Sequence, residues 1–577
     1  MYKLFSGNEA IARGAYEAGV KVAAAYPGTP STEILENVAK YDVIDSQWSP
    51  NEKVALEVAI GASIGGARAL STMKHVGVNV AADPLMSYTY IGVNGGLVLV
   101  AADDPGMHSS QNEQDSRYWG LFAKIPVIEP SDSQEAKDFV KYAFEISEMF
   151  DTPVILRTNT RVSHSKSMVK LEEPKEIVIK EYIKTPEKYV ILPKHARVRH
   201  SEVEKRRIAL EEFAGKTHLN RIEWGDRKLG IITSSINYQY VKEVIPEASV
   251  LKIGLAWPLN EALIKEFANG VERLVIVEEL EPIFETQIKA MGIKVEGKSI
   301  IPREGELTED ILRKAFFDIE KTELYQSAQN LPVRPPILCP GCPHRGTFYV
   351  LTKMKLTVTG DIGCYTLGAA PPFNRIDTTI CMGASIGALF GLEKALGKEF
   401  SQKTVGVIGD STFYHSGMTG LLNMVYNGST STLLILDNST TAMTGHQDHP
   451  GTGKALMGHD TPHINLEDVV KALGVKRVRN ADPFTLKDLE AVLKEELTAE
   501  ETSVIIVKRP CALIQKKHDT PYSVDEDKCI ACKKCLKVGC SAISVDQKSS
   551  IDQLMCVGCG VCRQVCPKDA IVKAGVQ

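Results

Sequence analysis

The chain has 577 residues, of which 44% are hydrophobic and 24% charged, and its formal net charge is −5. This composition is ordinary for a globular protein, and a prior of about 150 residues per domain predicts roughly four domains. The charge is too small to indicate nucleic acid or an anionic membrane as a partner. No apolar run reaches the roughly 18 residues of a membrane-spanning helix.

The chain contains thirteen cysteines, and their use depends on the compartment in which the protein functions. Residues 1–14 lack the apolar core and the cleavage site of a signal peptide, so we expect a cytoplasmic protein. In a reducing compartment, cysteines serve metal or redox chemistry more often than structural disulfides. The composition therefore predicts a protein that binds metal or transfers electrons.

Short apolar segments alternate with helix-like segments in the first third of the chain. Residues 7–19 and 52–67 have apolar side chains at helical spacing. Buried strands are expected at residues 21–28, 67–74, 95–104, 125–130 and 152–159. Strands that alternate with helices predict a doubly wound parallel sheet for residues 1–193.

The rest of the chain divides where its composition changes. Residues 194–228 are highly charged and lack a strong apolar face, which predicts a linker that contains helix. The strand–helix alternation resumes in residues 229–330 and, after a proline-marked boundary, in residues 331–515. Residues 522–577 form a cysteine-rich module. The expected fold class is α/β, with several doubly wound parallel-sheet domains and a C-terminal α+β module.

Two cysteine runs stand in that module. The second, CVGCGVCRQVCP, has the C-x2-C-x2-C-x3-C-P spacing of bacterial iron–sulfur ligands. The first, CIACKKCLKVGC, has four residues before Cys540 and no following proline, so the type of the cluster that includes Cys540 stays open. The fourth cysteine of each run normally binds the other cluster. This predicts one 4Fe–4S cluster on Cys529, Cys532, Cys535 and Cys566, and another on Cys540, Cys556, Cys559 and Cys562.

Residues 526–577 thus resemble a two-cluster ferredoxin. The alternatives are a zinc site or a disulfide scaffold, but zinc ligands rarely come as three cysteines at two-residue intervals twice over. Because clusters of the ferredoxin type are often oxygen-labile, we expect an anaerobic environment.

Two strand ends in residues 331–515 carry ligands for a hard cation. The strand TVGVIG ends in Gly409, Asp410 and Ser411, and the strand TLLILD is followed by Asn438. The carboxyl ends of parallel strands meet at one edge of a sheet. Mg²⁺ on a diphosphate needs few protein oxygens, and Asp410, Asn438 and the Thr440 carbonyl would supply three. The alternative is two ordinary turns, where Asp and Asn are common.

The spacing of Asp410 and Asn438 resembles the motif of thiamine-diphosphate enzymes, although Ser411 stands where glycine is usual. These enzymes need a carboxylate against the aminopyrimidine of the cofactor. Glu52 begins an E-x-x-A-x-x-x-A-x-G pattern typical of that helix, and Asn51 or Ser49 could cap it. The rival, Glu57, lacks the spacing that follows, and either residue could be a solvated helix carboxylate.

Four further cysteines, Cys339, Cys342, Cys364 and Cys511, stand at turns of the same region. Four such thiols suit a tetrathiolate cluster. The alternative is that some are buried apolar cysteines, which are common in cores. Only Cys381 then remains, and we expect it to be an ordinary core residue.

Together these patterns resemble the 2-oxoacid:ferredoxin oxidoreductases, and among them the α subunits of the indolepyruvate type. The matching segments are YPGTPSTEI, MKHVGVNVAADPLM, GMHSSQNEQDSR, CPGCPHRG, GDSTFYHSG and DNSTTAMTGHQ. The resemblance implies the domain order of the chain: pyrimidine-binding (1–193), linker (194–228), transketolase-C-terminal-like (229–330), diphosphate-binding (331–515) and ferredoxin (522–577). It also implies a third, proximal 4Fe–4S cluster on the four further cysteines.

The activity implied is oxidative decarboxylation of an aryl 2-oxoacid such as indolepyruvate or phenylpyruvate. Thiamine diphosphate, Mg²⁺ and the clusters are the implied cofactors, coenzyme A the co-substrate, and ferredoxin the electron acceptor. No γ-type domain is recognisable in the chain, which implies a β subunit and a hetero-oligomer of α2β2 type.

The resemblance also implies roles for individual residues. Glu52 would assist the cofactor, and Thr29 matches a position near the substrate carboxylate. His415, His344 and His75 could lie near the reacting centre, although a lone loop histidine is more often structural. Besides Glu52, the residues expected to bind the cofactor are Gly409, Asp410, Ser411, Asn438, Thr440, Thr444 and His344.

Three other functions stay open. The substrate could be pyruvate or a branched-chain 2-oxoacid, the enzyme could be a non-oxidative thiamine decarboxylase or carboligase, or the chain could only transfer electrons. Oxidative chemistry predicts that substrate reduces the clusters, and bound thiamine diphosphate and Mg²⁺ would count against a pure electron carrier.

Overall fold

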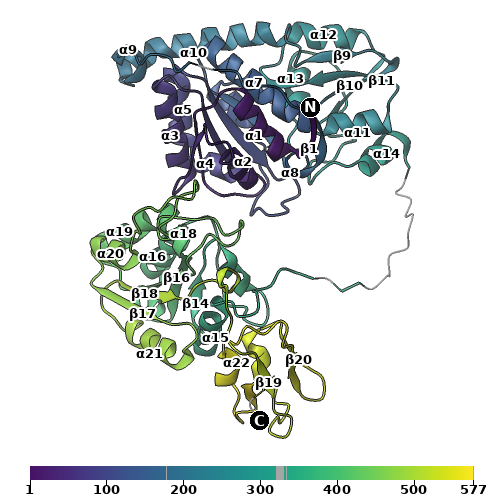
Figure 1. The fold of residues 1–577 in the computed structure, drawn as a ribbon. Helices are drawn as coiled ribbons and strands as arrows, with labels where there is room; N and C mark the ends of the chain where they lie inside the picture. Colours follow the sequence, from purple (N-terminus) through teal and green to yellow (C-terminus); the bar gives the residue numbers. More distant parts are fainter. Residues whose placement is uncertain (177, 320–330, 333, 576–577) are drawn as a thin grey trace. The chain divides into compact units, whose positions relative to one another are not determined.

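The computed structural model describes residues 1–575 except 177, 320–330 and 333. The chain divides into two units, Met1–Ser327 and Ala328–Gln577 (Figure 1). Among the described helices, none has the length and apolar character needed to cross a bilayer.

A seven-stranded sheet forms the centre of the first unit, in the order β12-β6-β7-β5-β4-β2-β3. All neighbours are parallel except β12, which pairs antiparallel with β6. Every residue of β4 to β7 is buried, as expected for a parallel sheet covered on both faces. The strands are β2 (Val22–Ala25), β3 (Asp45–Trp48), β4 (Ala69–Lys74), β5 (Leu97–Asp103), β6 (Val127–Ile128), β7 (Val154–Asn159) and β12 (Leu255–Trp257).

Helices connect these strands, and several begin at a capping side chain. Ser6 and Glu9 form a capping box at α1, Asn51 caps α3, and Asp132 caps α7. The helices are α1 (Gly7–Glu17), α2 (Thr32–Val38), α3 (Glu52–Ile64), α4 (His75–Val80), α5 (Ala82–Ile91), α6 (Arg117–Ala123), α7 (Ser133–Phe150) and α8 (Thr160–His164). A separate antiparallel pair joins β1 (Tyr2–Ser6) to β8 (Lys166–Lys170).

The charged segment expected as a linker is mostly helical. It contains α10 (Pro193–Ala214), preceded by the short α9 (Pro186–Tyr189). A four-stranded sheet follows in the order β13-β10-β11-β9. Its elements are β9 (Arg221–Glu223), β10 (Asp226–Ser234), α11 (Asn237–Val244), β11 (Ala248–Ile253), α12 (Glu261–Asn269), β13 (Arg273–Val277), α13 (Ile283–Ala290) and α14 (Glu309–Phe317).

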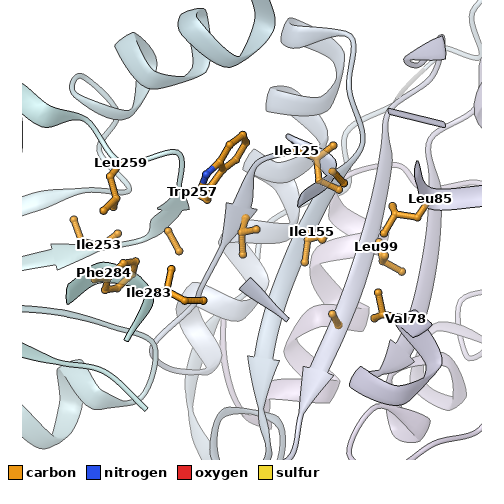
Figure 2. Close-up of a cluster of buried hydrophobic side chains, with 14 of the residues drawn as sticks. Val78, Leu85, Leu99, Ile125, Ile155, Ile253, Trp257, Leu259, Ile283 and Phe284 are labelled. Atoms are coloured by element: carbon orange, nitrogen blue, oxygen red, sulfur yellow. The ribbon is translucent and has the colours of Figure 1, made fainter. Parts of the chain in front are cut away.

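The two sheets of the first unit share one hydrophobic core. Figure 2 shows apolar side chains from the first sheet and its helices meeting those from the second sheet. The first group includes Leu99, Ile155 and, from β12, Trp257, and the second includes Ile253 of β11 together with Phe284 of the helix α13. Because β12 also extends the first sheet, residues 1–193 and 229–300 are packed as one body. The domain boundaries within this unit stay a prediction.

The second unit contains a five-stranded parallel sheet, in the order β14-β15-β16-β18-β17. Its strands are β14 (Thr357–Thr359), β15 (Thr404–Gly409), β16 (Thr432–Asp437), β17 (Arg477–Ala481) and β18 (Ser503–Lys508). Its helices are α15 (His344–Met354), η1 (Cys364–Ala369), α16 (Ala384–Leu396), α17 (Lys398–Ser401), α18 (Asp410–Thr412), η2 (Phe413–Gly417), α19 (Met418–Tyr426), α20 (Leu466–Ala472), α21 (Leu486–Glu496) and η3 (Ala512–Ile514).

A small module ends the second unit. Two antiparallel strand pairs and two short helical segments hold the cysteine runs. These elements are β19 (Tyr522–Val524), η4 (Lys534–Val538), β20 (Ile543–Val545), β21 (Ser549–Ile551), α22 (Val561–Gln564) and β22 (Ile571–Lys573). The parallel sheets and this terminal module confirm the predicted fold class.

Candidate functional sites

Glu52 lies at the carboxyl edge of the first sheet. It begins α3, where the Asn51 side chain accepts a hydrogen bond of 2.9 Å from the Val54 amide. Its side chain is buried and packs against Gly77 of α4. A Cβ atom on Gly77 would stand 2.7 Å from Glu52 Oε1, so only glycine permits this approach. Glu57, by contrast, is exposed and paired with Lys53, which favours Glu52 as the residue that acts at this edge.

Loops from three neighbouring strands surround Glu52. Lys74 ends β4, and burial lowers its pKa while the carboxylates of Asp104 and Glu52 oppose that shift. Its Nζ donates to the Ser109 carbonyl at 3.2 Å, and the Ser109 hydroxyl donates to the Thr29 carbonyl at 3.4 Å. The predicted residues Thr29 and Glu52 therefore lie at one edge. Lys74 lies in the matching segment MKHVGVNVAADPLM, but no role was predicted for it, and its part in linking these loops is visible only in the structure.

His75 is completely buried at the start of α4. Its Nε2 lies 3.1 Å from the Asn112 carbonyl oxygen, and Nδ1 has no hydrogen-bond partner among the described residues. Burial lowers the pKa of His75. The ring is thus held near the same edge in its neutral form.

Asp410 lies at the corresponding edge of the sheet in the second unit. It is buried, and it accepts hydrogen bonds from the Ser411 amide at 2.9 Å and the Ser439 amide at 2.8 Å. His449 Nε2 lies 3.2 Å from Asp410 Oδ2. Burial raises the pKa of Asp410, and His449 opposes this shift. Sequence reasoning missed His449, because it is 39 positions from Asp410 and belongs to no pattern recognised there.

Asn438 completes an arrangement suited to a cation. As the amide is oriented, its oxygen lies 3.1 Å from Asp410 Oδ1 and 2.9 Å from the Thr440 carbonyl oxygen, so it faces only acceptors and three oxygens converge. An octahedral Mg²⁺ with ligands at about 2.1 Å holds neighbouring oxygens about 3 Å apart. Rotation of the amide would instead give two hydrogen bonds. The three predicted ligands are brought together, and their spacing fits Mg²⁺.

The other predicted cofactor residues lie around this edge. Thr441 donates to the Ser411 hydroxyl at 2.8 Å, and a Cβ on Gly409 would stand 2.7 Å from the Tyr365 ring. The Thr444 hydroxyl donates to Gln447 Oε1 at 2.6 Å. Thr444 therefore already has a protein partner, and a cofactor would have to share it.

The two predicted histidines of the second unit are both buried. His415 lies in η2, with Nδ1 2.6 Å from the Ser416 hydroxyl. His344 begins α15 and meets the ring of Tyr365 edge-on, with centroids 5.8 Å apart. Burial lowers the pKa of His344 to about 4. Their roles stay predictions.

Two cavities in the terminal module are lined by cysteines, and we call them the outer and inner cysteine pockets. Cys566 lies with the cysteines of the first run, and Cys540 lies with those of the second. The outer pocket is lined by Cys529, Cys532, Cys535 and Cys566. The inner pocket is lined by Cys540, Cys556, Cys559 and Cys562. Ligation of iron by either set stays a prediction.

The four further cysteines also gather, and we call them the proximal set. Burial raises the pKa of Cys342 to about 12, with smaller contributions from the nearby thiols of Cys364 and Cys511. Burial likewise raises the pKa of Cys364 to about 11, and Cys511 and Cys339 add to this. The thiols therefore lie within electrostatic range of one another. No group of three or more His, Cys, Asp or Glu side chains in the described part is arranged for a single metal ion.

The proximal set connects the Asp410 edge to the inner pocket. The Cys511 amide donates to the Asn438 carbonyl at 2.9 Å. Cys342 itself lines the inner pocket, together with Gly341 and Arg345. Cys381 is exposed, so its expected place in the core was wrong.

Comparisons with known proteins agree with this layout. Family models match the chain in four stretches: the thiamine diphosphate-binding domain of pyruvate flavodoxin/ferredoxin oxidoreductase at residues 13–208, the indolepyruvate oxidoreductase domain at 235–323, the C-terminal TPP-binding domain of thiamine pyrophosphate enzymes at 361–507, and a 4Fe–4S binding domain at 550–572.

Full-length relatives decide the family. Indolepyruvate oxidoreductase subunit IorA of Archaeoglobus fulgidus is 43% identical, over 98% of this chain and 97% of its own. The IorA subunit of Pyrococcus abyssi is 45% identical, over 99% and 96% respectively. The chain belongs to the IorA family. It is therefore an oxidoreductase subunit with thiamine-diphosphate-binding domains and a 4Fe–4S module, as the sequence predicted.

A solved 2-oxoglutarate:ferredoxin oxidoreductase from Magnetococcus marinus, with 2-oxoglutarate, coenzyme A and succinyl-CoA bound, aligns with a TM-score of 0.45. It is 17% identical to this IorA-family chain and covers 51% of it and 61% of its own length.

Proposed function

We propose that the chain, together with a β subunit, oxidatively decarboxylates aryl 2-oxoacids such as indolepyruvate and forms arylacetyl-coenzyme A. The observation that carries this proposal is the series of cysteine sets that begins one hydrogen bond from the Asp410 edge. A non-oxidative decarboxylase has no electrons to export along such a series. The names of the full-length relatives support indolepyruvate as the substrate.

In the proposed reaction, the bond between the keto carbon and the carboxylate breaks and carbon dioxide leaves. The keto carbon loses two electrons and becomes the carbonyl of a thioester with coenzyme A. Thiamine diphosphate, when bound, supplies the electron sink for this cleavage. Asp410, Asn438 and the Thr440 carbonyl would hold Mg²⁺ for its diphosphate, and Gly409, Ser411, Thr444 and His344 would line the cofactor site.

Glu52 supplies the proton-exchanging carboxylate of the proposed reaction. Its burial and its close approach to Gly77 keep the carboxylate in one position and exclude water from one side of it. Thr29, on the adjoining loop, binds the substrate carboxylate, and His415 acts at the reacting centre. Neutral His75 contributes a hydrogen-bonding ring to the Glu52 edge.

Held by the proximal set, the inner pocket and the outer pocket, three 4Fe–4S clusters would supply the one-electron carriers that this two-electron oxidation needs. The outer pocket is a suitable exit, because Cys532 is exposed and Lys528, Lys534 and Lys568 line the cavity. Such a basic rim complements an acidic ferredoxin. The β subunit completes the enzyme as a hetero-oligomer of α2β2 type.

The test is anaerobic turnover by the chain co-expressed with its β subunit. Indolepyruvate with coenzyme A should bleach the clusters and yield carbon dioxide and indoleacetyl-coenzyme A, and pyruvate should be turned over more slowly. Faster turnover of pyruvate would overturn the substrate class. Release of an aldehyde with the clusters still oxidised would overturn the oxidative mechanism.

A further inference from the structure

Arg345 connects the proximal set to the ferredoxin module. It follows His344 in α15 and is 3% exposed. Its Nε donates to the Cys339 carbonyl at 2.8 Å, and Nη2 donates to the Leu338 carbonyl. On the other side, Nη1 donates to the Gly539 carbonyl, directly before Cys540. One guanidinium thus binds the backbone of both cysteine regions.

This buried cation has no carboxylate within ion-pair distance among the described residues, and its hydrogen bonds in this part of the chain go to backbone carbonyls. A buried charge is unfavourable unless an opposite charge compensates it. Cysteines of both sets lie around it instead. Cys342, Cys540 and Cys559 line the inner pocket together with Arg345, and the Cys339 carbonyl accepts its Nε hydrogen bond. None of the four outer-pocket cysteines lines that pocket.

The backbones around Arg345 approach too closely for larger residues. Gly341, at φ +69°, lies so near Val557 that a Cβ atom would overlap its side chain. Gly539, at φ +67°, would place a Cβ 2.8 Å from Pro372 and 3.2 Å from Arg345 Nη1. Both positions favour glycine on conformational grounds as well. The contact between the two cysteine regions is therefore a fixed one.

We propose that Arg345 is a positioning residue for electron transfer, a fixed positive charge between the proximal and inner clusters that favours their reduced states. The inference rests on the proposed function, because it requires clusters in both sets. A cluster gains one electron and no bond changes when it is reduced, so its negative charge increases. A nearby cation stabilises the more negative state and raises the reduction potential.

The experiment compares Arg345→Gln and Arg345→Lys with the control Arg375→Gln in the whole enzyme, purified anaerobically with the β subunit. Arg375 is a half-buried arginine of the same unit that donates to the Leu356 carbonyl at 3.2 Å. Iron content and the potential of each cluster, from redox titration followed by electron paramagnetic resonance, are the readouts.

In Arg345→Gln, the equilibrium constants for reduction of the proximal and inner clusters should fall about tenfold. This lowers their reduction potentials by about 59 mV, because each is a one-electron couple. The outer cluster should not change and serves as an internal reference. Arg345→Lys keeps the charge and should shift the potentials less, while hydrogen exchange in residues 536–541 becomes faster because the forked contact is lost. Arg375→Gln should match the unaltered enzyme.

Full iron content with unchanged potentials in Arg345→Gln would overturn the inference. If that variant does not retain iron, Arg345→Lys decides, because unchanged potentials together with unchanged exchange would also overturn it. A different result would refute the proposed electron path itself: about eight irons in the unaltered chain instead of about twelve would mean that the proximal cluster does not exist.

Discussion

The two units of the chain use different chemistry in their interiors. All thirteen cysteines lie in the second unit, from Cys339 onward, and the first has none. The first unit instead buries a network of charges at the ends of its strands. Arg157 pairs with Asp103 at 2.7 Å, and Arg117 pairs with Asp115 at 2.6 Å and with Glu278 at 2.7 Å.

This difference indicates a division of labour. The Arg117 network joins the loop after β5 to the segment after β13, so it fixes the edge near Glu52 across both sheets of the first unit. The second unit carries the converging oxygens and the cysteine pockets. Proton chemistry and positioning would thus depend on the first unit, and cation binding and electron export on the second.

The largest effect should come from the carboxylate of the first unit. Glu52→Gln should lower turnover by about 10²- to 10⁴-fold, because the amide keeps the size of the side chain but cannot accept the proton. Steady-state kinetics, with iron content unchanged, checks this. Glu57→Gln is the matched control on the same helix. If Glu52→Gln were fully active and Glu57→Gln inactive, the catalytic role would belong to Glu57 instead of Glu52.

Asp410→Ala should instead weaken cofactor binding in the second unit. Loss of an outer-shell partner reduces metal affinity by about 10- to 100-fold, so loss of a direct ligand should exceed about 100-fold. Titration of cofactor-free protein with thiamine diphosphate and Mg²⁺ gives the affinity. The exposed Asp460→Ala is the control, and an Asp410 variant with unaltered affinity would remove this residue from the cation site.

Breaking the charge network should destabilise the first unit without touching the clusters. Arg157→Met leaves the buried carboxylates of Asp103 and Glu129 without their cation, which typically reduces the free energy of unfolding by about 3 to 5 kcal/mol. As the control, Arg161→Met removes an exposed ion pair with Glu306 and should change the free energy of unfolding by less than about 1 kcal/mol. Thermal unfolding and iron analysis together test this. Loss of iron in Arg157→Met would contradict the proposed division of labour between the two units.

The smallest effects distinguish individual cysteines. Cys511→Ala should remove about four of roughly twelve irons, because a cubane needs its thiolate ligands. Cys381→Ala should leave both iron and stability nearly unchanged, since the thiol is exposed. Iron and sulfide analysis measures both, and loss of iron from the Cys381 variant would refute the cysteine assignment.

Local patterns predicted much of this molecule. The cysteine spacing indicated which thiols share a pocket, and the strand-end positions of Asp410 and Asn438 indicated that they meet. These features depend on short intervals or on the regular geometry of a parallel sheet. Contacts between distant segments had no such signal. Lys74, His449 and Arg345 gain their surroundings from loops that only the folded chain brings together.

The packing within the first unit could not be predicted from the sequence for a similar reason. Strand β12 has three residues, too few for a recognisable period, yet it extends the main sheet. The helix α10 has few buried residues, so its charged sequence was expected to be mainly a linker. Exposure of Cys381 was likewise unpredictable, because nothing in its neighbours marks a surface position.

The antiparallel pairing of β12 with β6 determines how this protein can be divided for study. A fragment that stops at residue 193 would leave the backbone of β6 unpaired at an open edge and uncover the apolar surface that meets Trp257 and Phe284. Open edges and bare apolar patches promote aggregation. The smallest well-behaved fragment of the first unit should therefore extend beyond α13, although a family model for its first part ends at residue 208.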